Sequence, residues 1–251
     1  MIDLHTHILP GLDDGARTIE DSRGLARLSL AEGVTTIAAT PHVRADYPTT
    51  ADEMEVGVEA LRADFAAEGI PVDVVHGGEL DLEHLRGLDE DELRRFTLGQ
   101  SGRYLLVETP YRGWPLDLEQ RVFELGLIGL APILAHPERN TEVQSDPNRL
   151  VPLVERGGLV QITAASLDGR IGKRAKATAT RLLDEGLAHL IASDAHTPEI
   201  REGGLAAAAE ALGDAPLATF LTEDVPAAVL SGERLPDRPE PRRRRRLLGR
   251  G

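Results

Sequence analysis

Residues 1–32 read MIDLHTHILPGLDDGARTIEDSRGLARLSLAE and carry the pattern that decides the fold. An apolar run, Met1–His5, predicts a β-strand, and the amphipathic segment Thr18–Glu32 predicts a helix. The same order recurs along the chain, and glycines mark the helix ends. Further strands are predicted at Thr35–Thr40, Val72–His76, Tyr104–Glu108, Gly129–His136, Leu159–Thr163 and Leu187–Ser193. Further helices are predicted at Ala51–Glu68, Leu116–Leu127, Pro147–Arg156 and Lys173–Glu185.

This alternation predicts an α/β fold with parallel strands and right-handed crossover helices. About seven strands favour a distorted β/α barrel, complete or incomplete, over an open sheet. The 251 residues are 41% hydrophobic but only 3% aromatic, so aliphatic side chains must fill a single core. We expect one domain over residues 1–234 and a disordered tail, rich in proline and arginine, over residues 235–251.

Charge and composition exclude several classes of protein. The formal net charge is −14, and the segment from Arg234 onward carries +6, which leaves −20 for the rest. This balance argues against a nucleic-acid partner. The chain has no cysteine, which excludes thiolate metal sites and a cysteine-based phosphatase. No apolar run has the length of a membrane span and the start lacks the pattern of a signal peptide, so we expect a cytoplasmic protein without stable membrane insertion.

Residue types that bind metals follow almost every predicted strand. The carboxyl ends of barrel strands meet at one mouth, so side chains from distant parts of the chain would converge there. A His-x-His motif at a strand end places two imidazoles on the same side of the extended chain, where both can reach one ion. A carboxylate that ends an apolar strand is costly to bury unless it is paired or bound to a metal. The candidate ligands are His5, His7, Asp14, His42, Glu79, Glu108, His136, Asp194 and His196.

Each candidate also has a structural explanation. Asp13 and Asp14 together could form the turn before the next helix, and a lone histidine such as His42 is more often structural than a ligand. The nine candidates as a set exceed what one ion needs and suit about two or three divalent ions. A set of imidazoles and carboxylates without sulfur fits manganese, iron or zinc.

Two arginines and two aromatic residues lie in the loops that should surround this mouth. Arg139 and Arg201 can bind phosphate oxygens through a two-pronged guanidinium, although either could be an ordinary surface arginine. Tyr111 and Trp114 either flank an aromatic substrate or pack their loop, and packing is slightly favoured. The remaining histidines, expected to be structural or solvated, are His76, His84 and His189.

Together these motifs resemble those of the PHP (polymerase and histidinol phosphatase) superfamily. The closer resemblance is to its manganese-dependent bacterial tyrosine-protein phosphatases of the CpsB/YwqE type. The matching stretches run in the family's order from Asp3 to Arg201 and read DLHTHILPGLDDGA, ATPH, GGEL, LLVE, LAHPERN and IASDAH. Gly78, Thr109 and Asn140 depart from the residues usual in the family, and they bear on substrate preference more than on activity.

The resemblance implies a distorted (β/α)7 barrel of the PHP type with a trinuclear metal site, most often Mn²⁺. It implies a hydrolase, a protein-tyrosine phosphatase that acts on the phosphotyrosine tail of a bacterial tyrosine kinase controlling capsule or exopolysaccharide synthesis. Arg139 and Arg201 match phosphate-binding positions of the family. The implied ligands are His5, His7, Glu79 and Asp194 for a first ion, Glu79, Glu108 and His136 for a second, and Asp14, His42 and His196 for a third.

Two rival functions stay open. The first is hydrolysis of histidinol phosphate or another small phosphoester within the same superfamily. The second is a metal-stabilised regulatory module that binds kinase or envelope partners without turnover, which the complete ligand set argues against. The sequence leaves the oligomeric state open.

Overall fold

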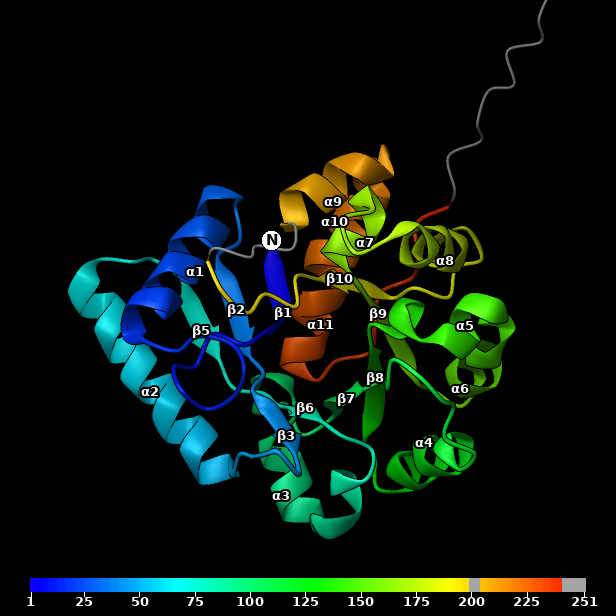
Figure 1. Cartoon of the computed structure of the whole chain (residues 1–251), viewed down its shortest axis with the longest axis horizontal. Coiled ribbons are helices and arrows are strands. Elements are labelled where there is room, and N and C mark those ends of the chain that lie inside the picture. The colour runs from blue at the N-terminus through cyan, green and yellow to red at the C-terminus, as the bar shows by residue number, and fades with distance from the viewer. Residues whose placement is uncertain (199–203, 241–251) are drawn as a thin grey trace, which may run out of the picture.

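The computed structural model describes residues 1–198 and 204–240. Helices surround the strands on the outside of the molecule, as Figure 1 shows. Strands occur near all predicted positions, and two of them match the predicted bounds. The strands are β1 (Ile2–Thr6), β2 (Thr36–Ala39), β3 (His42–Arg44), β4 (Tyr47–Pro48), β5 (Asp73–Val75), β6 (Glu79–Leu80), β7 (Tyr104–Glu108), β8 (Ala131–Ala135), β9 (Leu159–Thr163) and β10 (Leu190–Ala192).

The two longest helices each begin after a threonine that caps the N-terminus, Thr18 and Thr50. Thr18 precedes the first helix and accepts a hydrogen bond from the Asp21 backbone N–H, while the Asp21 carboxylate accepts one from Thr18, which satisfies two otherwise unpaired donors. The α-helices are α1 (Ile19–Ala31), α2 (Ala51–Glu68), α3 (Glu90–Arg95), α4 (Leu118–Leu127), α5 (Thr141–Ser145), α6 (Val151–Glu155), α7 (Ala164–Asp168), α8 (Lys173–Asp184), α9 (Leu205–Leu212), α10 (Ala215–Thr219) and α11 (Val225–Ser231). Short turns of other helix types are η1 (His84–Gly87), η2 (Leu98–Gln100), η3 (Pro137–Arg139), η4 (Pro147–Leu150) and η5 (Phe220–Asp224).

The predicted parallel α/β architecture is confirmed, with two sheets. One has the order β1-β2-β5, and the other has the order β10-β9-β8-β7-β6-β3-β4. All pairings are parallel except that of β3 with β4. The central strands of the two sheets are buried on both faces, which is why their sequences are continuous apolar runs.

A closed barrel, in contrast, is not confirmed. The two sheets touch where β1 meets the segment after β10, through a single bridge between Thr6 and Ala195. The backbone N–H of Asp194 donates to the carbonyl of His5 at 2.9 Å, and that of His7 donates to Ala195 at 2.9 Å. The chain therefore forms two sheets in contact, and the predicted ring of seven strands is not formed by regular pairing among the described strands.

Two of the predicted strands are each followed closely by a second, short strand that was not predicted. β3 follows β2, and β6 follows β5. After β2, residues Thr40 and Pro41 interrupt the ladder, since proline has no N–H to donate. After β5, Gly78 lies so close to Phe96 that an added Cβ would approach its ring to 2.7 Å. At both breaks the chain passes from the first sheet to the second, where β3 pairs with β6 and His42 lies opposite Glu79.

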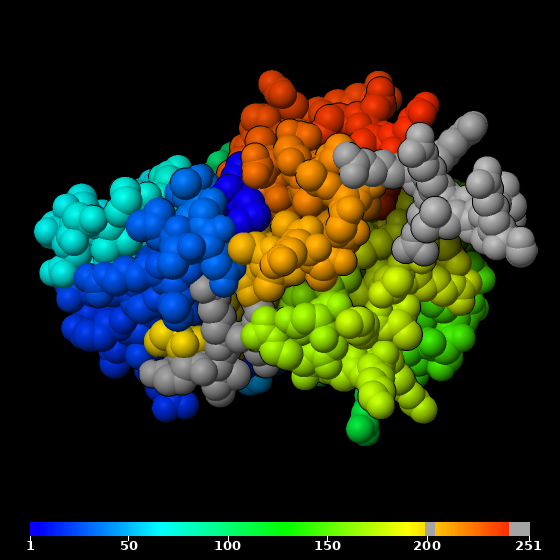
Figure 2. Space-filling model, turned by 90° about the horizontal axis from the view of Figure 1, so that it is seen from above, coloured from blue at the N-terminus to red at the C-terminus, as the bar shows by residue number. Residues whose placement is uncertain are grey.

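The C-terminal helices complete the fold. Figure 2 shows residues 204–240, in orange to red, gathered side by side on that face of the molecule. Within this segment, α9 contacts β10, and both η5 and α11 contact β1. Alanine fills much of α9, so its sequence lacks the alternation of polar and apolar faces that marks an amphipathic helix. No described helix is both long and apolar enough to cross a bilayer.

The first residues of the predicted tail pack against the rest of the chain. Leu235 lies against the hydrophobic core, and Arg238 donates to the carbonyls of Ala188 at 2.6 Å and Leu183 at 3.1 Å. These contacts join Leu235 and Arg238 to the preceding part of the chain. Residues 241–251 of the predicted tail lie outside the described residues.

Candidate metal centre

The candidate ligands come from six strands or the residues that follow them. His5 lies in β1, His42 in β3 and Glu79 in β6, while Glu108 is the last residue of β7. The other candidates follow β1, β8 or β10 directly or in the next loop. Because these strands are parallel, their carboxyl ends meet and the side chains gather at one place. In four groups, one possible ligand atom of each residue lies within 4.8 Å of those of the others. The groups are His7, Asp14, His42 and His196; His5, Glu79 and His136; His5, His7 and Asp194; and His42, Glu79 and Glu108.

Close contacts across these groups link four buried side chains, those of His5, His7, Glu79 and Asp194. The two Nε2 atoms of His5 and His7 are 3.2 Å apart. His5 Nε2 lies 3.3 Å from both Glu79 Oε2 and Asp194 Oδ1, and His7 Nε2 lies 3.5 and 3.4 Å from the same two oxygens. A tetrahedral site with ligands about 2.0–2.1 Å from an ion has edges of about 3.3–3.4 Å. These five distances match edges of such a tetrahedron, so each pair of atoms that they join has the spacing of two ligands of one divalent cation.

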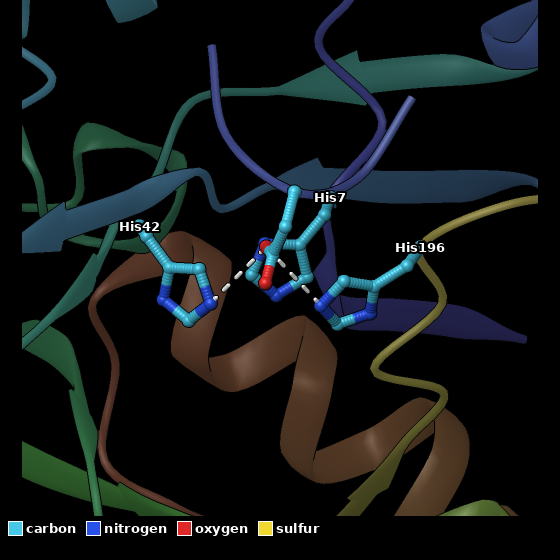
Figure 3. A group of neighbouring side chains, drawn as sticks. His7, His42 and His196 are labelled. Atoms are coloured by element: carbon cyan, nitrogen blue, oxygen red, sulfur yellow. Dashed lines mark ion pairs between the residues drawn. The ribbon is translucent and has the colours of Figure 1, made fainter. Parts of the chain in front are cut away.

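A second group surrounds Asp14. Figure 3 shows the rings of His7, His42 and His196 turned toward a common point. Asp14 Oδ1 lies 3.5 Å from His42 Nε2 and 3.6 Å from His196 Nε2, the two ion pairs drawn there. Asp14 is 42% exposed at its side chain, so this group opens to solvent while the first is enclosed.

Glu79 lies between the groups. Its Oε1 accepts from His136 Nε2 at 2.9 Å, and its Oε2 lies 3.0 Å from His42 Nδ1. Both His42 Nδ1 and Glu79 Oε2 are buried without a hydrogen-bond partner. Two such atoms in contact are costly without a cation or proton between them.

The structure does not place Glu108 with His136, as the resemblance implied for one ion. Glu108 lies beside His42 and Glu79 instead, and its oxygens accept from Arg44 Nη1 at 3.1 and 3.3 Å. Arg44 is not among the residues predicted from the sequence, because a single arginine two residues after His42 carries no distinctive signal.

Backbone geometry aims two of the candidates inward. His136 and Asp194 have φ angles of +39° and +55°, in the left-handed region that residues other than glycine rarely adopt. Such a conformation costs on the order of 1–3 kcal/mol and persists where the surrounding structure imposes it, frequently at functional sites. Both residues directly follow or nearly follow a strand, so the turn of the backbone brings their side chains into the group.

The electrostatics of the group favour positive charge. Burial disfavours the charged form of His5, but the charges of Glu79 and Asp194 outweigh it and raise the pKa of His5 to about 9. Burial likewise opposes ionisation of Glu79, yet the attraction of His5 and contacts from His136 hold the pKa of Glu79 well below its ordinary value. A pocket that retains protons on its histidines this strongly also attracts a divalent cation.

Two further residues orient the histidines. His7 Nδ1 donates to Asp13 Oδ2 at 2.7 Å, and His5 Nδ1 donates to Gln161 Oε1 at 3.0 Å. Each bond leaves the Nε2 atom of a neutral ring unprotonated and facing the group, as ligand histidines require. Gln161 was missed, because a polar residue inside the apolar run of β9 resembles no motif.

Asp13 is held by more than His7. Its oxygens also accept from the backbone N–H groups of Gly15 and His42, both at 2.9 Å. Burial would raise the pKa of Asp13, but His7 and these N–H groups lower it to about 2. Gly15 is required, since an added Cβ would lie 2.2 Å from the His7 carbonyl oxygen.

Asp13→Asn should therefore weaken metal binding about 10- to 100-fold. Asparagine has one acceptor oxygen for the three donors, and its NH₂ group would face a backbone N–H. Isothermal titration of the metal-free variant would measure the change. Asp21→Asn is the matched control, because Asp21 also accepts two backbone N–H bonds, from Arg17 and Thr18, but does so at the start of α1. Equal affinities for wild type and Asp13→Asn would contradict the role.

The predicted phosphate-binding residues can be placed in part. Arg139 Nη1 donates to Asp194 Oδ2 at 2.6 Å, and its guanidinium lies over the Tyr111 ring at 4.7 Å. Trp114 packs against the core as expected, whereas Tyr111 remains 49% exposed. Arg201 lies outside the described residues.

The histidines expected to be structural belong to none of the four groups found in the described chain. His189 Nδ1 accepts from the backbone N–H of Val160 at 3.1 Å, a contact that requires a neutral ring. Burial lowers the pKa of His189 to about 4, in agreement with that contact.

Comparison with known proteins gives a consistent result. The family model for capsular polysaccharide synthesis, CpsB/CapC, matches residues 1–215. Tyrosine-protein phosphatase YwqE of Bacillus subtilis (strain 168) is 35% identical over 254 residues, 99% of either chain. Tyrosine-protein phosphatase CpsB of Streptococcus pneumoniae is 30% identical over 214 residues, 80% of this chain and 85% of that protein.

A solved structure agrees. It was described among crystal structures of YwqE from Bacillus subtilis and CpsB from Streptococcus pneumoniae, as metal-dependent tyrosine phosphatases. It superimposes with a TM-score of 0.85 at 33% identity and covers 96% of this chain and 100% of that one.

Proposed function

Because the chain belongs to the CpsB/CapC family of capsular polysaccharide synthesis, we propose that it is a metal-dependent protein-tyrosine phosphatase. The name tyrosine-protein phosphatase, carried by a relative that matches nearly the whole chain, supports this assignment. The observation that carries the proposal is the set of 3.2–3.5 Å contacts among His5, His7, Glu79 and Asp194, a spacing suited to a divalent ion.

In this proposal roughly two or three divalent ions share the centre, with manganese first among manganese, iron and zinc. His5, His7, Glu79 and Asp194 would hold one ion. Asp14, His42 and His196, which lie close to one another near solvent, would hold another. Glu79 is shared, because one oxygen faces His136 and the other faces the histidines of the first ion. The remaining proposed ligands are His136 and Glu108.

Ions bound here would activate a water and neutralise charge on a phosphoryl group. The chain's own residues do the rest. Asp13 and Gln161 keep the His7 and His5 rings in the orientation that presents Nε2. Arg139 offers guanidinium N–H groups beside Asp194, where they can bind phosphate oxygens and orient phosphorus for in-line attack. We propose Arg201 for the same task.

The substrate class follows from the family. We propose a phosphotyrosine segment of a bacterial tyrosine kinase that controls polysaccharide synthesis, in keeping with the family's description. We further propose that the reaction takes place in the cytoplasm, where the ATP that such a kinase uses as its phosphate donor is found. We also propose that the two sheets are parts of one distorted seven-stranded barrel, supported by the bridge between Thr6 and Ala195.

A substrate panel tests the function. The metal-loaded full chain is assayed on a phosphotyrosine peptide, a phosphoserine peptide and histidinol phosphate, with and without a chelator. We expect turnover of phosphotyrosine, loss of turnover on chelation, and recovery with Mn²⁺. Elemental analysis should show at least about two equivalents of metal per chain. A strong preference for histidinol phosphate would favour the small-molecule rival, and metal binding without any turnover would favour the regulatory module.

A further inference from the structure

Tyr111 lies beside a candidate ligand and the proposed phosphate-binding arginine. The protein has only three tyrosines, and this one lies in the loop between β7 and α4 with 49% of its surface exposed. Its ring centre is 5.6 Å from that of His136 and 4.7 Å from the guanidinium carbon of Arg139. The ring therefore stands at the edge of the proposed metal centre, partly in solvent.

The backbone that carries Tyr111 is anchored. The side-chain amide of Asn140 donates to the carbonyls of Pro110 at 2.6 Å and Gly113 at 2.9 Å. The backbone N–H of Thr141 donates to the carbonyl of Tyr111 itself at 3.0 Å. These bonds hold the loop on both sides of the residue, so the exposed ring is presented by a fixed backbone.

The chemistry of the neighbours limits what such a ring can contact. In an aryl phosphate a single oxygen separates phosphorus from the ring, so the ring cannot be far from whatever binds the phosphate. Arg139 is the arginine proposed above to bind the phosphate, and its guanidinium lies against the Tyr111 ring. Aromatic pairs interact favourably when their centres are about 4.5–7 Å apart, a range that a substrate ring beside Arg139 would meet.

We propose that Tyr111 is a specificity-determining residue, whose ring stacks against the aromatic ring of an aryl phosphate bound at the metal centre. The proposal rests on the phosphatase function proposed above and deepens it. Tyr111 would favour aryl over alkyl phosphate esters, because an alkyl group gains little from the aromatic face. The size of the preference expected from one such pair is about 3- to 10-fold.

The test uses binding as well as turnover. Phenylphosphonate and methylphosphonate are non-hydrolysable probes that share the charged head and differ in the ring. Their affinities for the Mn²⁺-loaded full chain are measured by calorimetry in wild type, Tyr111→Phe, Tyr111→Leu and Tyr111→Ala. Leu116→Ala is the matched control, since Leu116 is fully exposed in the same loop. Metal content is determined for every variant.

We expect wild type and Tyr111→Phe to bind phenylphosphonate more tightly than methylphosphonate. We expect Tyr111→Leu and Tyr111→Ala to lose about 3- to 10-fold in phenylphosphonate affinity, with methylphosphonate affinity and metal content unchanged. The same variants should raise KM for a phosphotyrosine peptide more than they lower kcat. Leu116→Ala should behave as wild type.

Three results would overturn the proposal: an undiminished phenyl preference in Tyr111→Leu and Tyr111→Ala, equal losses for both probes, or a phenyl preference lost equally in Leu116→Ala. Equal losses would mean that the ring acts only by holding Arg139. Failure of the proposed function gives a different result, namely no turnover of phosphotyrosine by wild type. The ratio of the two phosphonate affinities still reports on Tyr111 in that case.

Discussion

Glu79→Gln is expected to lower kcat on phosphotyrosine by about a hundredfold or more, the range typical of a lost electrostatic interaction in an active site. The side chain is fully buried, and each of its oxygens faces a different part of the centre. Oε1 lies 2.9 Å from His136, while Oε2 lies 3.0 Å from His42 and 3.3 Å from His5. Glutamine keeps the shape, removes the negative charge and turns an NH₂ group toward one of these sets of nitrogens. Metal content should fall together with activity.

The chain supplies a matched control in Glu138. This second buried glutamate lies two residues from His136, but its Oε1 accepts from the Thr163 backbone N–H at 2.8 Å and from Ser166 Oγ at 2.6 Å. Burial raises the pKa of Glu138, so glutamine resembles the protonated form that this environment favours. Glu138→Gln should retain metal and most of the activity. If Glu79→Gln did the same, the shared-ligand role of Glu79 would be excluded.

The contrast between these two glutamates shows what a sequence can and cannot reveal. Both follow an apolar strand or its neighbouring turn, so a rule based on strand ends marks both as candidates. Only the backbone geometry separates them. The left-handed φ of +39° at His136 turns the chain so that Glu138 points back to β9. A conformation of that kind depends on tertiary packing, which local sequence does not encode.

The gathering of ligands was predictable because parallel strands place their ends together wherever the helices run. The division of the ligands into four groups was not predictable, because it depends on the interruptions of the strands at Pro41 and Gly78. At these breaks the chain changes sheet and brings His42 opposite Glu79. A prediction from spacing treats β2 and β5 as single strands and cannot locate the offset. Glu108 beside Arg44 is a consequence of the same offset.

Residues that act through a ligand were the hardest to find. Asp13 was weighed as a possible helix start, and in the structure it binds His7 rather than the first turn of α1. Gln161 lies in the middle of β9, where its neighbours are apolar and only its contact with His5 explains it. No spacing rule predicts such residues, because the ligands that they contact lie in other parts of the sequence.

Arg139→Ala is expected to lower kcat/KM for a phosphotyrosine peptide by about 10- to 150-fold, equivalent to about 1.5–3 kcal/mol for a charged hydrogen bond. The guanidinium donates to Asp194 Oδ2 at 2.6 Å, and the planar fork of an arginine side chain matches the geometry of phosphate oxygens. Metal content should persist, because Asp194 Oδ1 still faces His5 and His7 at 3.3 and 3.4 Å. Arg139→Lys should recover only part of the loss, since an ammonium cannot bind two oxygens in one plane.

Because Arg139 is paired with the candidate ligand Asp194, the experiment needs a control arginine that is paired with a carboxylate elsewhere. Arg121 is also paired with a carboxylate, Asp117 Oδ2 at 2.8 Å, but on α4, and Asp117 belongs to none of the four ligand groups of the described residues. Arg121→Ala should leave kcat/KM and metal content at the wild-type level. If Arg139→Ala lost metal in proportion to activity, its role would be to hold Asp194 in place and not to bind phosphate. Competitive inhibition by inorganic phosphate separates the two possibilities, since only a phosphate-binding arginine weakens inhibition while the metal remains bound.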